Sequence, residues 1–195
     1  TSSMSAERPR LSVVIPVCNA DQTLSALVSE LVAHVRAAGW TLEVVLVNDG
    51  STDDSWATIL DLRNRIGGIR GIDLMARTGQ FRALMCGLAQ SKGEIVVTMD
   101  DDLQHLPGDV VALVRALVDD STVDAVIGVP EARHHPWYRN TGSQLHDWIL
   151  RVSIGKPKGL QFGSFRAIRR LAVDALLSFD TLNPVPGPLL FRATR

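Results

Sequence analysis

Apolar residues follow two different patterns along the first 130 residues of the chain. Short, mostly apolar runs, such as LSVVIPV and LEVVLV, are typical of strands buried on both faces of a sheet. Longer stretches with apolar residues three or four positions apart, such as LSALVSELVAHVRAAG, are typical of amphipathic helices. The expected strands span residues 11–17, 42–47, 68–74, 94–99 and 123–129. The expected helices span residues 24–39, 79–93 and 108–120, and a further helix runs from the NDGSTDDS turn to about residue 66. Ser51 or Thr52 is expected to cap this further helix.

The alternation of strand and helix predicts one α/β domain with a Rossmann-like, mostly parallel sheet and helices on both faces. The alternation stops after Pro130. Residues 134–155 have a mixed helical pattern, and residues 163–178 have the pattern of a short strand that enters a helix. We expect residues 1–10 to be disordered or derived from a tag, and residues 11–195 to form a single domain that is truncated at its C-terminal end.

The composition suits a globular domain without a membrane-spanning segment. Of the 195 residues, 46% are hydrophobic and 21% are charged. No apolar run approaches the roughly 18 residues that a membrane helix needs, and the polar start TSSMSAERPR lacks the features of a signal peptide. The two cysteines, Cys18 and Cys86, lie in apolar surroundings and indicate no disulfide framework. We therefore expect a cytoplasmic protein.

Charge is distributed unevenly although the net charge is only −1. Residues 1–130 contain 10 Lys/Arg and 17 Asp/Glu, whereas residues 131–195 contain 10 Lys/Arg and 4 Asp/Glu. This asymmetry favours an acidic site in the first part facing a basic site in the last part, and chance surface charge is the alternative. The sequence has no basic stripe with interleaved aromatic residues, so nucleic acid is not an expected partner.

Three consecutive aspartates, Asp100 to Asp102, directly follow the strand expected over residues 94–99. Carboxylates this close repel one another and are costly to desolvate. Ligands of parallel α/β sheets bind beyond the carboxyl ends of the strands, and Mg²⁺ takes one or two carboxylates and completes its shell with water and phosphate oxygens. In an extended chain Asp100 and Asp102 share a face while Asp101 points elsewhere. The spacing favours a divalent-metal site. The alternative is that the acids only cap the start of the next helix, a role that Asp109 already fills.

The sequence excludes several other kinds of site. The dinucleotide fingerprint G-x-G-x-x-G is absent after the first strand, where the chain reads PVCNADQT. No G-x-x-x-x-G-K-[ST] phosphate loop, G-x-S-x-G elbow or C-x-x-C pair is present. Adjacent His134 and His135 have poor geometry for chelating one zinc ion.

Four stretches together resemble family 2 glycosyltransferases with the GT-A fold. They are VVIPVCNA, VLVNDGSTDDS, GQFRALMCGLAQSKGEIVVTMDDDLQHLP and GSFRAIRR, and they occur in the family's order between about Leu11 and Leu177. The branch that they resemble most is the polyprenyl-phosphate sugar transferases, which include dolichyl-phosphate mannose synthase and bacterial undecaprenyl-phosphate sugar transferases. The resemblance implies a UDP- or GDP-linked sugar as donor and Mg²⁺ or Mn²⁺ as cofactor.

The resemblance also implies a nucleotide pocket. The residues that it places beside the nucleotide are Pro16, Asn19, Asp49, Asp100 and Asp101. Asp49 is expected to accept a hydrogen bond from the base, although Asn19 and Asp49 would equally suit plain turn positions. The residues that it places in the helix behind the donor site are Gly79, Arg82 and Gly87. Arg82 would equally suit the surface.

Further residues are implied for the metal and for the acceptor. The implied metal ligands are Asp100, Asp102 and Gln104. The residues implied for an acceptor phosphate are Arg166, Arg133, Arg139 and Ser164. The implied catalytic residues are Asp100, Asp102 and Arg166. The family motif S-G-F-R stands here as GSFR, and the changed order of Gly163 and Ser164 puts the role of Ser164 in doubt more than that of Arg166. No local motif fixes Arg133 or Arg139, which would equally suit solvent.

The function that follows is inverting transfer of a sugar from a nucleotide-diphosphate sugar to a polyprenyl phosphate, assisted by a divalent metal. Two alternatives stay open: a nucleotidyltransferase that makes a nucleotide sugar, and a glycosyltransferase-like module that binds nucleotide without turnover. A phospho-receiver domain fits less well, because its acids follow strands one and three. The expected location is the inner face of a membrane, which this chain would approach peripherally, and a homo-oligomer is one option for its assembly.

Overall fold

A six-stranded sheet is the centre of the molecule. The structure is a computed structural model that describes residues 11–102, 106–128 and 164–179. The strands are β1 (Leu11–Val17), β2 (Leu42–Asn48), β3 (Ile69–Asp73), β4 (Ile95–Thr98), β5 (Ala125–Ile127) and β6 (Arg166–Arg169). The helices are α1 (Asp21–Ala37), α2 (Ser55–Arg65), α3 (Gln80–Gln90), α4 (Pro107–Asp119) and α6 (Arg170–Leu177). Over the described residues the expected order of elements is confirmed, with ends that differ by a few residues. The mixed helical pattern of residues 134–155 lies outside the described residues.

The strand order is β3-β2-β1-β4-β6-β5. Strands β3, β2, β1 and β4 are parallel to their neighbours, while β6 runs antiparallel to both β4 and β5. The sheet is therefore mostly parallel, as predicted. The chain builds outward from β1 through β2 to β3 and then returns to the other side of β1 as β4, so that the strand order reverses between β1 and β4.

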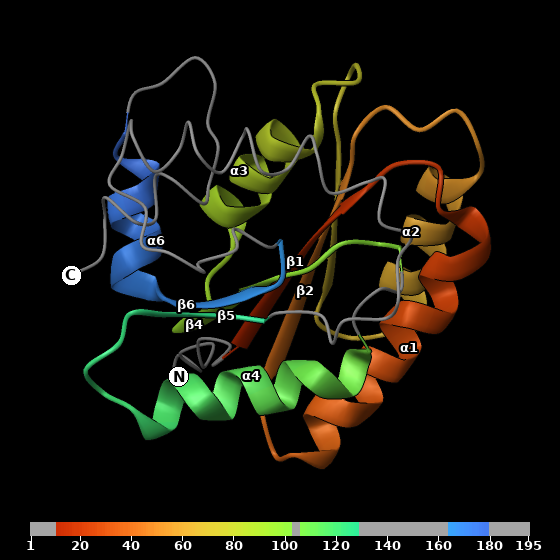
Figure 1. Cartoon of the computed structure of the whole chain (residues 1–195). Helices are drawn as coiled ribbons and strands as arrows, with labels where there is room; N and C mark the ends of the chain where they lie inside the picture. Colours follow the sequence, from red (N-terminus) through yellow and green to blue (C-terminus); the bar gives the residue numbers. More distant parts are fainter. Residues whose placement is uncertain (1–10, 103–105, 129–163, 180–195) are drawn as a thin grey trace, which may run out of the picture.

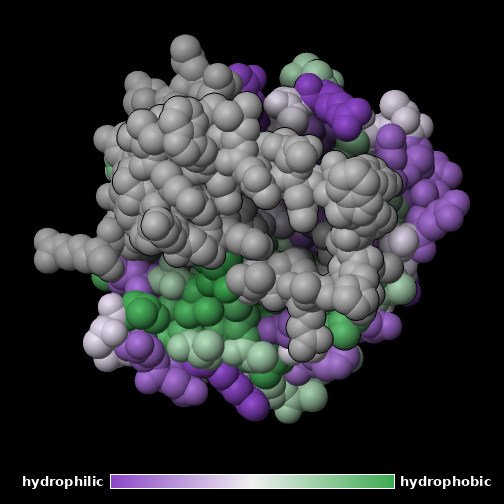
Figure 2. All heavy atoms as spheres, viewed as in Figure 1, coloured by the Kyte–Doolittle hydropathy of each residue, from purple (hydrophilic) through white to green (hydrophobic). Residues whose placement is uncertain are grey.

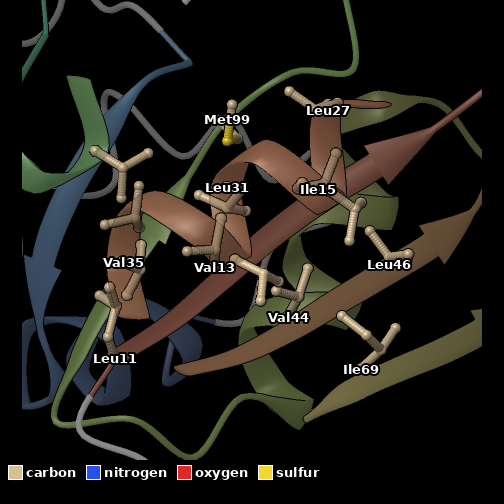
Figure 3. Packing of buried hydrophobic residues seen from close by; sticks show 14 of the residues in the cluster. Leu11, Val13, Ile15, Leu27, Leu31, Val35, Val44, Leu46, Ile69 and Met99 are labelled. Carbon is tan, nitrogen blue, oxygen red and sulfur yellow. The ribbon is translucent and has the colours of Figure 1, made fainter. Parts of the chain in front are cut away.

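Helices cover both faces of the sheet (Figure 1). Helices α1, α2 and α4 bury their apolar residues in one cluster, and α3 and α6 bury theirs in another. Strand β1 contributes to both, because alternate side chains point to opposite faces. In Figure 3, Val13 and Ile15 of β1 lie near Leu27 and Leu31 of α1, so the first cluster fills the space between strand and helix. This two-sided burial explains why the strand sequences are apolar at nearly every position.

The edge strand β5 leaves apolar side chains partly accessible. Its three residues are half-buried, and Val126 packs against the margin of the core. In the view of Figure 2, hydrophobic atoms gather in the region of α4 and β5 and are bordered by hydrophilic residues. Within the described ranges, none of the helices is long and apolar enough to span a membrane.

The predicted cap of α2 is wrong. Asp54 occupies the capping position and makes no side-chain capping bond. Ser51 and Thr52 instead join the loop after β1: the amide of Asn19 donates to Oγ of Ser51 (3.0 Å), and the amide of Thr52 donates to Oδ1 of Asn19 (2.8 Å). These two residues are used to hold two loops together rather than to start the helix.

Helix α3 lies unusually close to the sheet at Gly87. A Cβ atom at this position would come within 2.3 Å of Cγ1 of Val14 and 3.0 Å of Cγ2 of Val47. The absence of a side chain therefore sets how closely α3 packs on β1 and β2.

Candidate active site

A cavity of about 260 Å³ opens where the carboxyl ends of β1, β2 and β4 meet. This is the point at which the strand order reverses, the usual ligand site of an open α/β sheet. The residues that line the cavity are Pro16, Val17, Cys18, Asp49, Arg77, Gly79, Gln80, Asp100, Asp101 and Asp102. The structure thus brings together the predicted residues Pro16, Asp49 and the three consecutive aspartates.

The three aspartates follow β4 but have different surroundings. Both carboxylate oxygens of Asp100 accept hydrogen bonds, Oδ1 from Nε2 of Gln80 and Oδ2 from Oγ of Ser164. Asp101 turns toward β1, where its Oδ2 accepts a hydrogen bond from the amide of Cys18 (3.0 Å). Asp102 is exposed. The middle carboxylate, Asp101, was expected to point away from the other two. Its hydrogen bond from the amide of Cys18, which directly follows β1, is consistent with this expectation.

The charges of this cluster are only partly balanced. Burial, followed by the charges of Asp100 and Asp102, raises the pKa of Asp101, and the hydrogen bond from Cys18 opposes this shift. Within the described ranges, no group of three or more His, Cys, Asp or Glu side chains is arranged to hold a metal ion by itself. The residues nevertheless fit Mg²⁺ or Mn²⁺, because such ions use one or two carboxylates and take their other ligands from phosphates and water. Gln104, the third implied ligand, lies outside the described residues.

Asp49 anchors the loop between β3 and α3. This residue is 3% exposed, and its Oδ1 accepts hydrogen bonds from the amide (2.6 Å) and hydroxyl (2.9 Å) of Thr78. Its Oδ2 accepts a third from the amide of Gly79 (2.9 Å). Gly50, with φ of 63°, lets the same loop approach, since a Cβ there would lie 2.6 Å from the amide nitrogen of Arg77. The predicted contact between Asp49 and a nucleotide base stays a prediction, and this carboxylate already accepts three hydrogen bonds.

Asn19 lies just beyond β1 in a left-handed backbone conformation, with φ of 56°. Asparagine tolerates this region better than most residues. Its side chain is exposed and accepts a hydrogen bond from the amide of Thr52, and Asn19 is not among the residues that line the cavity. Pro16 is buried in β1 opposite Val47 and lines the cavity floor from the strand itself.

The GSFR stretch reaches the same site from β6. Arg166 pairs with Thr98 of β4 and is only 3% exposed. Burial lowers the pKa of the Arg166 guanidinium to about 10, and the charge of Asp100 opposes that shift. Arg166 therefore remains charged at neutral pH and lies under the influence of Asp100. Its proposed contact with an acceptor phosphate is untested, as is that of Ser164; Arg133, Arg139 and Gly163 lie outside the described residues.

Two other arginines of the basic C-terminal part hold the fold together. Arg169 donates to the backbone carbonyls of Leu117 (2.7 Å), Asp120 (3.1 Å) and Val123 (2.9 Å) at the end of α4. Arg170 donates to the carbonyl of Gly93 (2.9 Å). Part of the positive charge that suggested a basic binding site is therefore structural.

Four residues that line the cavity were not predicted from the sequence: Val17, Cys18, Arg77 and Gln80. Each lies at or after the carboxyl end of a strand, which is the signal that could have found them. Arg77 and Gln80 follow β3, at the far edge of the sheet, and reach the cavity because their loop crosses over β2. Of the helix residues that were predicted, Gly79 lines the cavity, Gly87 sets the packing of α3, and Arg82 is exposed in its first turn.

Comparisons with known proteins agree with this arrangement. The model of the family described as Glycosyl transferase family 2 matches residues 12–177. Undecaprenyl-phosphate 4-deoxy-4-formamido-L-arabinose transferase from Enterobacter sp. (strain 638) is 34% identical over 169 residues, which cover 86% of this chain and 51% of that protein. The chain thus spans about half the length of the curated relatives it matches.

Solved structures show the same fold. A mannosyltransferase from Pyrobaculum calidifontis in complex with GDP-Man and Mn²⁺ is 25% identical, with a TM-score of 0.63, and the match covers 88% of this chain and 47% of that one. Glucosyl-3-phosphoglycerate synthase from Mycobacterium tuberculosis is 23% identical, with a TM-score of 0.66, covering 87% and 60%. The predicted GT-A fold is confirmed, and the extent of the family match shows that this chain belongs to glycosyl transferase family 2.

Proposed function

We propose that this chain transfers a sugar, with inversion, from a nucleotide-diphosphate sugar to a polyprenyl phosphate, using a divalent metal ion. The observation that carries the proposal is the cavity at the strand-order reversal, which gathers the three consecutive aspartates and Arg77. The names of the relatives support undecaprenyl phosphate as the acceptor. The Pyrobaculum mannosyltransferase, solved with GDP-Man and Mn²⁺, supports a metal-bound nucleotide sugar as the donor.

The donor would lie across the cavity. Asp100 and Asp102 are the proposed ligands of the metal, which when bound would neutralise the diphosphate as it leaves. Arg77 lines the same cavity, and its guanidinium suits a phosphate oxygen. Asp49, by fixing Thr78 and Gly79, holds the loop that carries Arg77 in place. Positioning of donor and acceptor would then supply much of the rate.

The acceptor explains why no dedicated general base is required. A sugar hydroxyl needs a side chain to take its proton, whereas a phosphate monoester is already largely dianionic at pH 7. Among the described residues that line the cavity there is no histidine, and Asp100 and Asp101 are both held by hydrogen bonds. The phosphate oxygen would attack the anomeric carbon directly. Arg166 is the proposed cation for this phosphate, and the reaction would take place at the cytoplasmic face of a membrane.

The test offers the protein Mn²⁺, a panel of UDP- and GDP-linked sugars, and either undecaprenyl phosphate or simple sugar hydroxyls. We expect transfer to the lipid phosphate, loss of transfer in Asp102→Ala with the fold retained, and inverted configuration in the product. Preferred transfer to a hydroxyl would overturn both the acceptor and the base-free mechanism. Nucleotide binding without turnover would favour a binding module, and release of pyrophosphate from a nucleoside triphosphate and a sugar phosphate would favour a nucleotidyltransferase.

A further inference from the structure

The carboxylate of Asp100 accepts hydrogen bonds from two segments that are far apart in the sequence. Gln80, the first residue of α3, donates to one carboxylate oxygen, and Ser164, just before β6, donates to the other. Both donors are neutral, so they orient the carboxylate without cancelling its charge. Each carboxylate oxygen can accept about two hydrogen bonds or metal contacts. A single hydrogen bond to each oxygen therefore fixes the plane of the group and leaves acceptor sites for a cation.

Gln80 is also the end of a short segment that is fixed at two points. The amides of Thr78 and Gly79 donate hydrogen bonds to Asp49 at the end of β2, and the side chain of the next residue, Gln80, donates to Asp100 after β4. Arg77 stands at the start of this segment and lines the cavity. Segment 77–80 therefore spans the cavity from the β2 side to the β4 side.

We propose that Gln80 is a positioning residue that couples these two sides. By holding Asp100, it sets the orientation in which this carboxylate meets the metal, and it does so from the segment that carries Arg77. This inference rests on the proposed function, because it assumes a metal-assisted nucleotide site. The sequence around Gln80 contains no motif that would assign it this role, which follows only from the hydrogen bonds.

The test measures how much Mn²⁺ strengthens nucleotide binding. Calorimetry gives the Kd of UDP and of GDP in EDTA and in Mn²⁺, and the ratio of the two values is the metal increment. We expect Gln80→Met, which keeps the length of the side chain but has no amide donor, to lower the increment about tenfold, the usual effect of losing a hydrogen bond to a charged group. The Kd in EDTA should stay within about twofold of the unaltered chain, because Gln80 acts through the metal ligand.

Gln90→Met is the matched control, since Gln90 is an exposed glutamine at the other end of the same helix. It should leave the metal increment unchanged. A merely structural role for Gln80 predicts a different result: a lower melting temperature and weaker binding in EDTA and Mn²⁺ alike. That result, or a Gln80→Met protein with the full metal increment, would overturn the inference.

A double substitution shows whether Gln80 acts through Asp100. In an Asp100→Asn background, Gln80→Met should cause little further loss, because the ligand that Gln80 orients is already altered. Independent losses that add together would mean that Gln80 contacts the nucleotide itself, which also overturns the inference. If the unaltered chain shows no metal increment with any nucleotide, the proposed function fails and the inference fails with it. If the unaltered chain shows a metal increment and Gln80→Met keeps it in full, only the inference fails.

Discussion

Replacement of Asp49 by alanine tests whether this carboxylate is the anchor of the loop before α3. The substitution removes an acceptor that binds the amide of Thr78 at 2.6 Å, its hydroxyl at 2.9 Å and the amide of Gly79 at 2.9 Å. A hydrogen bond to a charged group contributes about 1.5–3 kcal/mol when buried. Because Thr78 and Gly79 are exposed, water can replace part of what they lose, and we take about 1 kcal/mol for each bond. The expected decrease in the free energy of unfolding is therefore about 2–4 kcal/mol.

Two measurements check this value. Urea denaturation gives the global change, and hydrogen exchange gives the local one. If the loop opens without global unfolding, the amides of Thr78 and Gly79 should exchange at least roughly 30-fold faster, which corresponds to about 2 kcal/mol. Asp61→Ala is the control: Asp61 is a 57% exposed partner of Arg65 on α2, and its loss should change stability by less than about 0.5 kcal/mol.

Two further variants separate the role of Asp49 as loop anchor from its predicted contact with the base. Thr78→Val removes one of the three bonds to Asp49 and leaves the carboxylate in place, so it should lower stability by about 1 kcal/mol without changing the preference between UDP and GDP. Asp49→Asn should change that preference if the side chain meets the base. An Asp49→Ala protein with unchanged stability and unchanged exchange at Thr78 and Gly79 would refute the anchor, and unchanged nucleotide affinity would refute the base contact.

Three further predictions follow from the structure. Folding raises the pKa of the Asp101 carboxyl above 3.8, so the folded protein keeps the carboxyl proton to a higher pH than the unfolded chain does. The free energy of unfolding should therefore fall as the pH rises from 3.8 through the raised pKa. Urea titrations at several pH values should show this contribution in the unaltered chain and not in Asp101→Asn. Gly87→Ala should lower stability by about 1–3 kcal/mol, since the added methyl group meets Val14 at 2.3 Å, and thermal unfolding measures the loss. In EDTA, added NaCl should strengthen UDP or GDP binding by screening the carboxylates of the cavity. Weaker binding in salt would contradict a net repulsion between these carboxylates and the nucleotide.

Much of the fold could be predicted from the sequence because the parallel strands are buried on both faces. Runs such as residues 11–17 and 42–47 are apolar except at Ser12 and Glu43, and this pattern distinguishes them from the helices between them. The position of β6 between β4 and β5 could not be predicted from the pattern of apolar residues. That antiparallel pairing joins residues about 70 positions apart, such as Thr98 and Arg166, and no local pattern encodes it.

The same limit applies to the candidate site. Asp49 and Asp100 could be selected because they directly follow apolar strands, where ligands of α/β sheets bind. Their partners could not, because Thr78 is 29 residues from Asp49 and Ser164 is 64 residues from Asp100. The alternative role of Asp49 as a loop residue was visible in the sequence, but the residues that it holds were not.

The charges around the cavity explain why a strand that is buried on both faces can end in three aspartates. Four carboxylates line the cavity, those of Asp49 and Asp100 to Asp102, whereas the cavity-lining cation among the described residues is Arg77. Arg166 adds a buried positive charge near Asp100, which still leaves an excess of negative charge. The donors that hold Asp100 and Asp101 are neutral, so they fix the carboxylates without neutralising them.

A nucleotide diphosphate brings further negative charge into this cavity and would be repelled by it. A divalent cation reverses the balance, because it attracts the carboxylates and the diphosphate at once. On the proposed function, the carboxylates of Asp100 to Asp102 therefore favour binding of the metal ion and the nucleotide together over binding of the nucleotide alone. The same repulsion that makes three adjacent carboxylates costly would then make nucleotide binding depend on the metal.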